Sequence, residues 1–172
     1  MSRTDSLNTF TAMWPTTRIY AGLATSSERG ARRAADDARA ERLERDGIDA
    51  FVDEWQREPV FASHAALPPA RAAGLRAERL RNRPAGLATS LRWAGQGTME
   101  PLHDRLAEVR APTLVIAGAL DPTGCDRAAS VAAGIRGARL AVVADAGHTP
   151  HLETPSRFRA LAIEFLKEDP AR

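Results

Sequence analysis

The sequence contains very little of what stabilises disulfide-rich or zinc-binding proteins. Its 172 residues include a single cysteine, Cys125, and only four histidines. One cysteine cannot form an intramolecular disulfide, and so few thiol and imidazole groups argue against a structural zinc site. We therefore expect no bound metal and a reducing, cytoplasmic location.

Long apolar runs and a one-sided charge are also lacking. No segment approaches the roughly 18 consecutive apolar residues that span a bilayer, and the amino terminus lacks the apolar core of a secretory signal. The 24 basic and 22 acidic residues leave a net charge of +2, which is far from the polybasic surface that coats nucleic acid. We expect neither a membrane nor a nucleic acid as partner. The hydrophobic content of 44% and the length fit a compact globular domain.

The chain divides into three predicted parts. Residues 1–24 show neither a helical period nor strand-like alternation, and we expect an irregular amino-terminal segment there. Residues 25–100 show helical patterns, whereas residues 101–172 contain two short apolar runs with a helical pattern between them and another after them. The expected fold class is α/β, with a helical part followed by a parallel βαβ unit.

Helix signals begin at Thr25. Thr25 and Glu28 have the spacing of a capping box, and the alanine-rich run that follows extends to Gly47, a residue type that ends helices. A second, short amphipathic helix is expected before Pro59. Its apolar stripe consists of Ile48, Phe51, Val52 and Trp55.

Two more helices are expected in this part of the chain. Pro69 can occupy the first turn of one that runs to about Arg81, while Asn82 and Pro84 look like the cap and first residue of another that ends near Gly95. Proline suits the first turn because its missing N–H group would have no partner there.

The period changes after residue 110. Residues 114–117 form a short continuous apolar run, as expected for a strand buried on both faces, and residues 139–144 form a second run. The residues between them have helical spacing, and Gly137 is expected to close that helix. After a loop, AGHTPHLE, Thr154 and Pro155 are expected to begin a final amphipathic helix.

Two polar side chains follow the two predicted strands. Asp121 lies after the first strand and His148 after the second. Catalytic groups of parallel sheets gather at the carboxyl ends of the strands, so we expect these side chains to meet there. A carboxylate that accepts from one imidazole nitrogen leaves the other nitrogen available as a base, as in a catalytic triad. The alternative is an Asp that only caps a helix and a His that only lies in a loop.

Four segments carry a more specific resemblance: FVDEWQREPVF, RLRNRPAGLATSLR, PTLVIAGALDP and AGHTPHLETPSRF. From about Glu28 to Leu166 the chain resembles the cap and carboxyl-terminal portion of an α/β hydrolase, and most of all the SHCHC (2-succinyl-6-hydroxy-2,4-cyclohexadiene-1-carboxylate) synthases of menaquinone biosynthesis. The resemblance implies a helical cap (lid) at residues 25–100 and a βαβα part of the hydrolase core at residues 101–172. It also implies that the N-terminal sheet strands of that fold are missing from this sequence.

The resemblance implies roles for four residues. Asp121 corresponds to the triad acid and His148 to the triad base, while Arg81 corresponds to a cap arginine that binds a substrate carboxylate and Trp55 to an aromatic residue lining the pocket. The family eliminates pyruvate from 2-succinyl-5-enolpyruvyl-6-hydroxy-3-cyclohexene-1-carboxylate without metal or organic cofactor. The implied substrate is thus a small anionic polycarboxylate.

The charge of the helical part agrees with an anionic substrate. Residues 71–92 hold six arginines and one acidic residue, Glu78. A guanidinium can bind a carboxylate with two parallel hydrogen bonds. The alternative is a solvated helix face in an arginine-rich protein, in which 23 of the 24 basic residues are arginine.

The nucleophile of an α/β hydrolase is absent from the sequence. No serine stands in a G-x-S-x-G segment, the tight turn that exposes the catalytic hydroxyl. We expect a truncated family member that is inactive alone, since a triad without its nucleophile retains little activity. The alternatives are a fragment of a generic esterase or hydrolase, and a non-catalytic module that associates with itself or with a chain supplying the missing strands.

Four further side chains carry reactive groups, but a structural interpretation is preferred for each. We expect His64 and His103 to be structural, and His151 to be a neighbour of the site that either supports the catalytic residues from behind or faces solvent. Cys125 is expected to be a small packing residue, although a position near a helix start could lower the pKa of its thiol.

Overall fold

A computed structural model describes residues 21–168, which form two compact units. The helical unit comprises residues 22–58 and 68–101, and the sheet unit comprises residues 21, 59–67 and 102–168. Most of the irregular segment expected at residues 1–24 lies outside the described residues. Within residues 21–168, no helix combines the length and the apolar character needed to cross a bilayer.

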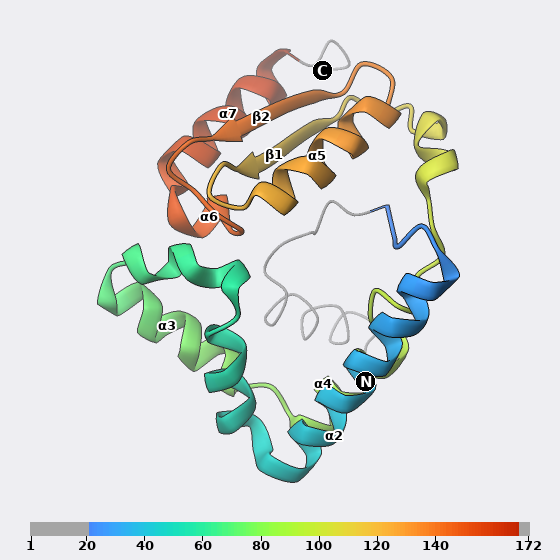
Figure 1. Ribbon diagram of the computed structural model, residues 1–172. Helices are drawn as coiled ribbons and strands as arrows, with labels where there is room; N and C mark the ends of the chain where they lie inside the picture. The colour runs from blue at the N-terminus through green and yellow to red at the C-terminus, as the bar shows by residue number, and fades with distance from the viewer. Residues whose placement is uncertain (1–20, 169–172) are drawn as a thin grey trace, which may run out of the picture. The chain divides into compact units, whose positions relative to one another are not determined.

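The longest element of the helical unit is α2, Ser26–Gln56 (Figure 1). The predicted capping box is confirmed, because Thr25 Oγ1 accepts from the Glu28 N–H at 3.1 Å and the Glu28 carboxylate accepts from the Thr25 N–H at 2.9 Å. Gly47 has φ 83° and ψ 177°, and it kinks the element at the predicted helix end. The two predicted helices therefore form one element with a break at Gly47.

The other two helices of this unit are α3, Pro69–Leu80, and α4, Pro84–Ala94. Both begin with the predicted proline. The prediction that Asn82 caps α4 is wrong, because the residue before α4 is Arg83 and no side chain caps it. Asn82 instead donates its side-chain amide to the Arg79 carbonyl at 2.8 Å, which satisfies an acceptor at the end of α3.

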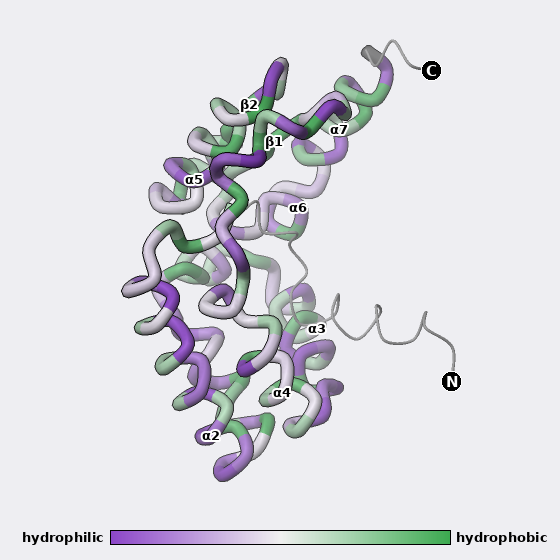
Figure 2. The backbone as a smooth tube through the Cα atoms, turned by 90° about the vertical axis from the view of Figure 1, so that its right-hand side faces the viewer, coloured by the Kyte–Doolittle hydropathy of each residue, from purple (hydrophilic) through white to green (hydrophobic). Residues whose placement is uncertain are grey.

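Most buried residues of the helical unit are apolar, Asp36 and Arg79 being charged exceptions. Hydrophilic and hydrophobic residues are interleaved along α2 (Figure 2), as its amphipathic pattern requires. The buried apolar residues of the three helices are Ala40, Leu43, Phe51, Val52, Trp55, Leu87, Ala88 and Leu91.

The sheet unit contains two parallel strands, β1 (Leu114–Gly118) and β2 (Arg139–Val143), in register from Leu114↔Arg139 to Gly118↔Val143. Helix α5, Pro122–Gly134, connects them, and it ends before Gly137, where the sequence pattern placed its end. Figures 1 and 2 show α5 on one face of the sheet and α7, Pro155–Glu168, on the other. The predicted α/β class and the strand–helix–strand order are confirmed.

Three short helical elements complete this unit. They are the 3-10 helices η1 (Pro59–Ala66) and η2 (His103–Glu108) and the one-turn helix α6 (Pro150–Glu153). Helix α6 lies inside the segment AGHTPHLE, which was predicted to be a loop. Its single turn is too short to show a helical period in the sequence.

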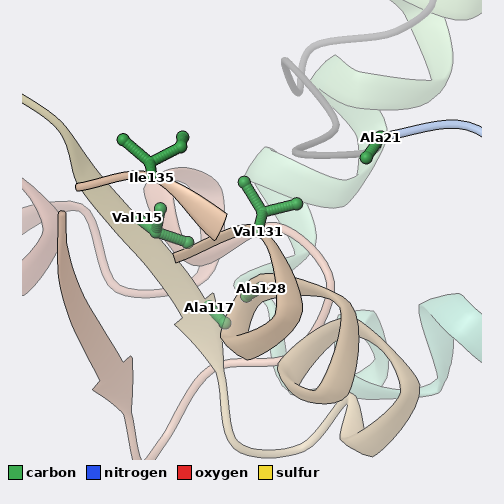
Figure 3. Close-up of a cluster of buried hydrophobic side chains, with 6 residues drawn as sticks. All are labelled: Ala21, Val115, Ala117, Ala128, Val131 and Ile135. Atoms are coloured by element: carbon green, nitrogen blue, oxygen red, sulfur yellow. The ribbon is translucent and has the colours of Figure 1, made fainter. Parts of the chain in front are cut away.

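The core of the sheet unit lies between β1 and α5 (Figure 3). It consists of Ala21, Val115, Ala117, Ala128, Val131 and Ile135. Each buried valine or isoleucine contributes roughly 1.5–3 kcal/mol relative to an exposed one. The prediction that β1 is buried on both faces holds only in part, since Leu114 and Ile116 are half-buried.

Strand β2 is much more exposed than its apolar sequence suggests. The exposed fractions of Leu140 and Val142 are 41% and 51%. Among residues 21–168, β2 pairs with β1 alone, and β1 with β2 alone.

Candidate active site

The loops that follow the two strands run side by side. The Ala119 N–H donates to the Val143 carbonyl and the Leu120 N–H to the Ala146 carbonyl, both at 2.9 Å. Their approach requires glycine at the end of β1, because a Cβ atom on Gly118 would overlap the Gly147 carbonyl oxygen. Strand pairing and this close contact together bring the two polar loops to one edge of the sheet.

Asp121 and His148 meet at this edge, as their positions after the strands predicted. His148 Nδ1 lies 2.6 Å from Asp121 Oδ2, and the two side chains are only 16% and 13% exposed. The other carboxylate oxygen, Oδ1, accepts from the Gly124 N–H at 2.9 Å and caps α5. Asp121 therefore uses one carboxylate oxygen to cap the helix and the other to bind His148.

The hydrogen bond fixes the tautomer of His148. An ionised carboxylate only accepts hydrogen bonds, so Nδ1 must carry the proton and Nε2 must hold the lone pair of the neutral ring. Nε2 is buried and has no hydrogen-bond partner among the described residues. An imidazole in this state can take a proton from a group placed at Nε2, while Asp121 stabilises the resulting cation.

Element η1 packs against this histidine. The Phe61 ring meets the His148 ring edge-on, with centroids 5.7 Å apart at 83°, and its centroid lies 5.1 Å from that of His64. Phe61 is buried. The imidazole is therefore bounded by an apolar ring on one side and by the Asp121 carboxylate at Nδ1.

A second polar cluster adjoins the His148 loop, and the sequence did not single it out as functional. The Glu153 carboxylate accepts from the backbone N–H groups of Gly147 and Thr149, at 2.7 and 2.8 Å, and from the Thr149 hydroxyl at 2.9 Å. His64 Nε2 lies 2.7 Å from the same hydroxyl oxygen. The signal that could have found the cluster is the four-residue spacing of Thr149 and Glu153 around one helical turn.

The other two predicted structural side chains are also placed. Half-buried His151 packs its ring against Phe158, and burial lowers the pKa of its imidazole, against the opposing effect of the Glu153 charge. Cys125 donates its thiol to the Gly118 carbonyl at 3.2 Å. Burial, followed by the charges of Asp121 and Asp126, raises the pKa of this thiol, which is the opposite of an activated nucleophile.

Trp55 and Arg81, the candidate substrate-binding residues, both belong to the helical unit. Trp55 is buried, stacks on Phe51 with ring centroids 5.8 Å apart, and has the Arg39 guanidinium 5.6 Å from its ring centroid. The Arg81 side chain is 77% exposed and lies 3.4 Å from the Glu78 carboxylate.

Among the arginines of residues 71–92, the buried one is Arg79, which is 4% exposed. Burial lowers the pKa of its guanidinium. Periodicity in α3 could have found it, since Arg79 falls four residues after Leu75 and seven after Ala72 on the inward stripe. Over residues 21–168, no group of three or more His, Cys, Asp or Glu side chains is placed to hold a metal ion.

Comparison with known proteins connects this geometry to a family, although no family model matches the chain. A Bacillus subtilis protein provisionally named 2-succinyl-6-hydroxy-2,4-cyclohexadiene-1-carboxylate synthase is 37% identical over 84% of this chain and 53% of its own length. The synthase of that name from Serratia proteamaculans is 31% identical over 84% of this chain and 54% of its own.

Solved structures agree. The structure of MenH from S. aureus matches with a TM-score of 0.85 and 35% identity, covering 87% of this chain and 56% of MenH. A thermophilic esterase from Thermogutta terrifontis matches with a TM-score of 0.67 and 26% identity, over 86% of this chain and 53% of the esterase. The chain is thus a relative of the SHCHC synthases with part of an α/β-hydrolase fold, and it spans about half the length of the curated relatives it matches.

Proposed function

We propose that this chain carries the acid–base and substrate-binding part of an SHCHC-synthase active site. The observation that supports this most directly is the 2.6 Å contact between His148 Nδ1 and Asp121 Oδ2, with the buried Nε2 left without a partner. The relatives are named as synthases of 2-succinyl-6-hydroxy-2,4-cyclohexadiene-1-carboxylate. The reaction that the family resemblance implies is the elimination of pyruvate from 2-succinyl-5-enolpyruvyl-6-hydroxy-3-cyclohexene-1-carboxylate. No metal or organic cofactor is needed for it.

His148 has a defined part in this elimination. Within the triad of the family, its Nε2 takes up, through the serine hydroxyl, the proton that leaves the substrate ring. The C–H electron pair forms a new ring double bond, the existing one shifts, and the C–O bond to the enolpyruvyl group breaks. The enolate that leaves takes up a proton from the imidazolium or from water and becomes pyruvate. Asp121 stays ionised and stabilises the imidazolium that forms. The cost of forming that cation in a mostly buried place is offset by the adjacent carboxylate.

Whether this chain catalyses the reaction depends on a second chain that supplies the serine of the triad. It has no G-x-S-x-G segment, so the chain alone is expected to release no pyruvate from the substrate. The test mixes it with a second chain, made from the part of the Bacillus subtilis relative that this sequence does not match, and measures pyruvate. The mixture should release pyruvate and lose that activity with His148→Gln; release that persists with His148→Gln contradicts the proposed base.

Substrate binding can be tested without turnover. Arg81 is the proposed carboxylate ligand because it matches the cap arginine of the family and its side chain is exposed. Calorimetric titration with the substrate should show weaker binding to Arg81→Ala than to Arg83→Ala, a matched loss of one exposed arginine charge. If both substitutions weaken substrate binding equally, the arginines act only through the positive charge of the surface, and Arg81 is not a specific carboxylate ligand.

A second candidate function is non-catalytic association, with another copy or with a chain that supplies strands. The exposure of Leu140 and Val142 on a two-stranded sheet favours it, since apolar strands rarely face water over a long stretch. Light scattering should then show a dimer or larger assembly that Val142→Lys disrupts. A monomer at all concentrations removes this candidate.

A generic ester hydrolase is the remaining alternative. It is favoured by the match to the thermophilic esterase. Release of p-nitrophenol from p-nitrophenyl acetate by the reconstituted mixture, in the absence of pyruvate release from the synthase substrate, would support it over the synthase.

A further inference from the structure

The His148 loop is held on both sides by one carboxylate. Glu153 Oε2 accepts from the N–H of Gly147, the residue before His148, and Oε1 accepts from the N–H of Thr149, the residue after it. The distances are 2.7 and 2.8 Å, typical of hydrogen bonds to a charged acceptor. The backbone N–H groups of the residues on either side of His148 therefore share one anchor.

The surroundings of Glu153 make this anchor rigid. Its side chain is only 5% exposed, and Thr149 is 1% exposed. Gly147 also packs against η1, where a Cβ atom would overlap the Ser63 hydroxyl. The loop is thus fixed by Glu153 through its peptide groups and by Ser63 through close packing.

A hydrogen-bond chain continues from Glu153 into η1. The Thr149 hydroxyl donates its one proton to Glu153 Oε1 at 2.9 Å, so at 2.7 Å it accepts from His64 Nε2. His64 is consequently protonated on Nε2, whereas His148 is protonated on Nδ1. Glu153 also lies 3.8 Å from His64 Nε2, and it acts on His151 of its own helix by charge.

We propose that Glu153 is a positioning residue, which holds the backbone N–H groups of the residues before and after His148 so that the imidazole keeps its Nδ1–H directed at Asp121. The catalytic consequence rests on the proposed function, but the geometry does not. A carboxylate suits the task because both of its oxygens accept, and each can bind one of the two N–H groups. Nothing else among the described residues provides two acceptors at this place.

The ionisation of Glu153 is consistent with this role. Burial would raise the pKa of its carboxyl, but the hydrogen bonds from Gly147 and Thr149 together lower it below its ordinary value of 4.5. The Ser63 hydroxyl adds to the lowering, although it does not reach full hydrogen-bond geometry. Glu153 is therefore an anion at neutral pH, despite its burial.

The test uses the full chain labelled with ¹⁵N and needs no turnover. Long-range ¹H–¹⁵N spectra report the tautomer of His148, and hydrogen exchange reports the Gly147 and Thr149 amides. In Glu153→Gln one acceptor becomes an NH₂ donor, which faces a backbone N–H. We expect exchange at one or both amides to become about tenfold faster or more, and the His148 Nδ1–H signal to give way to a mixture of tautomers.

The matched control is Glu164→Gln, which removes the same charge from an exposed position on α7. It should leave the His148 spectrum unchanged. A folded Glu153→Gln chain with an unchanged His148 tautomer and slow exchange at both amides overturns the proposal, because a merely structural glutamate would change only the melting temperature.

A shorter carboxylate keeps the test decisive if Glu153→Gln does not fold. Glu153→Asp retains the charge but cannot reach both N–H groups, so one amide should lose protection and the tautomer should again become mixed; an intact His148 signature in this variant overturns the proposal. Failure of the proposed function looks different. In that case the reconstituted mixture would release no pyruvate, while the wild-type chain still showed a single His148 Nδ1–H tautomer and protected Gly147 and Thr149 amides.

Discussion

The two units of the molecule differ in the polar groups that they bury, although both carry exposed ion pairs, such as Arg139 with Glu164 in the sheet unit. In the helical unit most ion pairs lie at the surface, such as Arg92 with Glu44, Arg76 with Asp53 and Arg45 with Asp46. In the sheet unit the polar groups of the Asp121–His148 pair and of the Glu153 cluster are at most 16% exposed. Surface pairs stabilise a fold weakly, whereas a buried polar group costs free energy wherever it lacks a hydrogen-bond partner.

This difference indicates where the chemistry resides. In the Asp121–His148 pair, His148 Nε2 is buried and has no hydrogen-bond partner among the described residues. The proposed function assigns the proton transfer to this same atom. The sheet unit allows little change, because its loops pack backbone against backbone.

The largest difference is expected between glycines of the two units. Alanine at Gly118 would overlap the Gly147 carbonyl oxygen, so the loops must separate, and we expect Gly118→Ala to lower the free energy of unfolding by about 3 kcal/mol. Alanine at Gly74, in the middle of α3, meets no atom within 4 Å. Gly74→Ala should raise stability by roughly 0.5 to 1 kcal/mol through helix propensity.

Urea unfolding, followed by circular dichroism, measures both variants. The His148 spectrum provides a second readout, since only Gly118→Ala should disturb it. If both substitutions have the same effect, the close approach of the two strand loops at Gly118 contributes nothing to stability.

Asp36 is the exception in the helical unit and tests the comparison next. Its side chain is 2% exposed and pairs with Arg32 at 2.9 Å and Arg39 at 3.8 Å, whose own side chains are 22% and 24% exposed. Asp36→Ala leaves Arg32 without its carboxylate and Arg39 with Glu58 alone, and we expect a loss of about 2 kcal/mol after allowing for partial solvation of the arginines. Asp37→Ala, at an exposed position of the same helix, is the control. Equal losses would mean that burial of Asp36 contributes nothing.

Local signals explain what the sequence could predict. The capping box at Thr25, the break at Gly47 and the proline starts of α3 and α4 depend on residues within a few positions of each other. The meeting of Asp121 and His148 was also predictable, because parallel strands bring their carboxyl ends to one edge.

Features that depend on burial and on long-range contacts could not be predicted from the sequence. Strand β2 has an apolar sequence, yet its exposure depends on which elements cover it. The link from His64 to Glu153 joins residues 59–66 to a helix more than 80 positions later, and no local pattern encodes it. Among the arginines of residues 71–92, charge alone favoured exposed Arg81 as readily as buried Arg79.

Acid should destabilise the sheet unit through two groups. Burial lowers the pKa of His151 below 6.5, so the unfolded chain binds the proton more readily, and stability should fall as pH drops through 6.5. The hydrogen bonds of Glu153 hold its pKa below 4.5, so its contribution is present above 4.5 and is lost as pH falls below that value. Melting temperature against pH should therefore show two descents. His151→Leu should remove the first alone, and a first descent that survives this change would assign it to another group.

The smallest effect is expected for the surface pair of Arg92 and Glu44, whose atoms lie 2.7 Å apart in two parallel hydrogen bonds. The hydrogen bond to Arg92, opposed by partial desolvation, lowers the pKa of the Glu44 carboxyl. Solvent and salt screen a pair at the surface, so Glu44→Gln and Arg92→Gln should each change the melting temperature little, and the double variant should change it by the sum. A double-mutant cycle at low and high salt measures the coupling. Strong coupling that survives high salt would show that this pair behaves like the buried groups of the sheet unit, and the contrast between the two units would then not extend to their ion pairs.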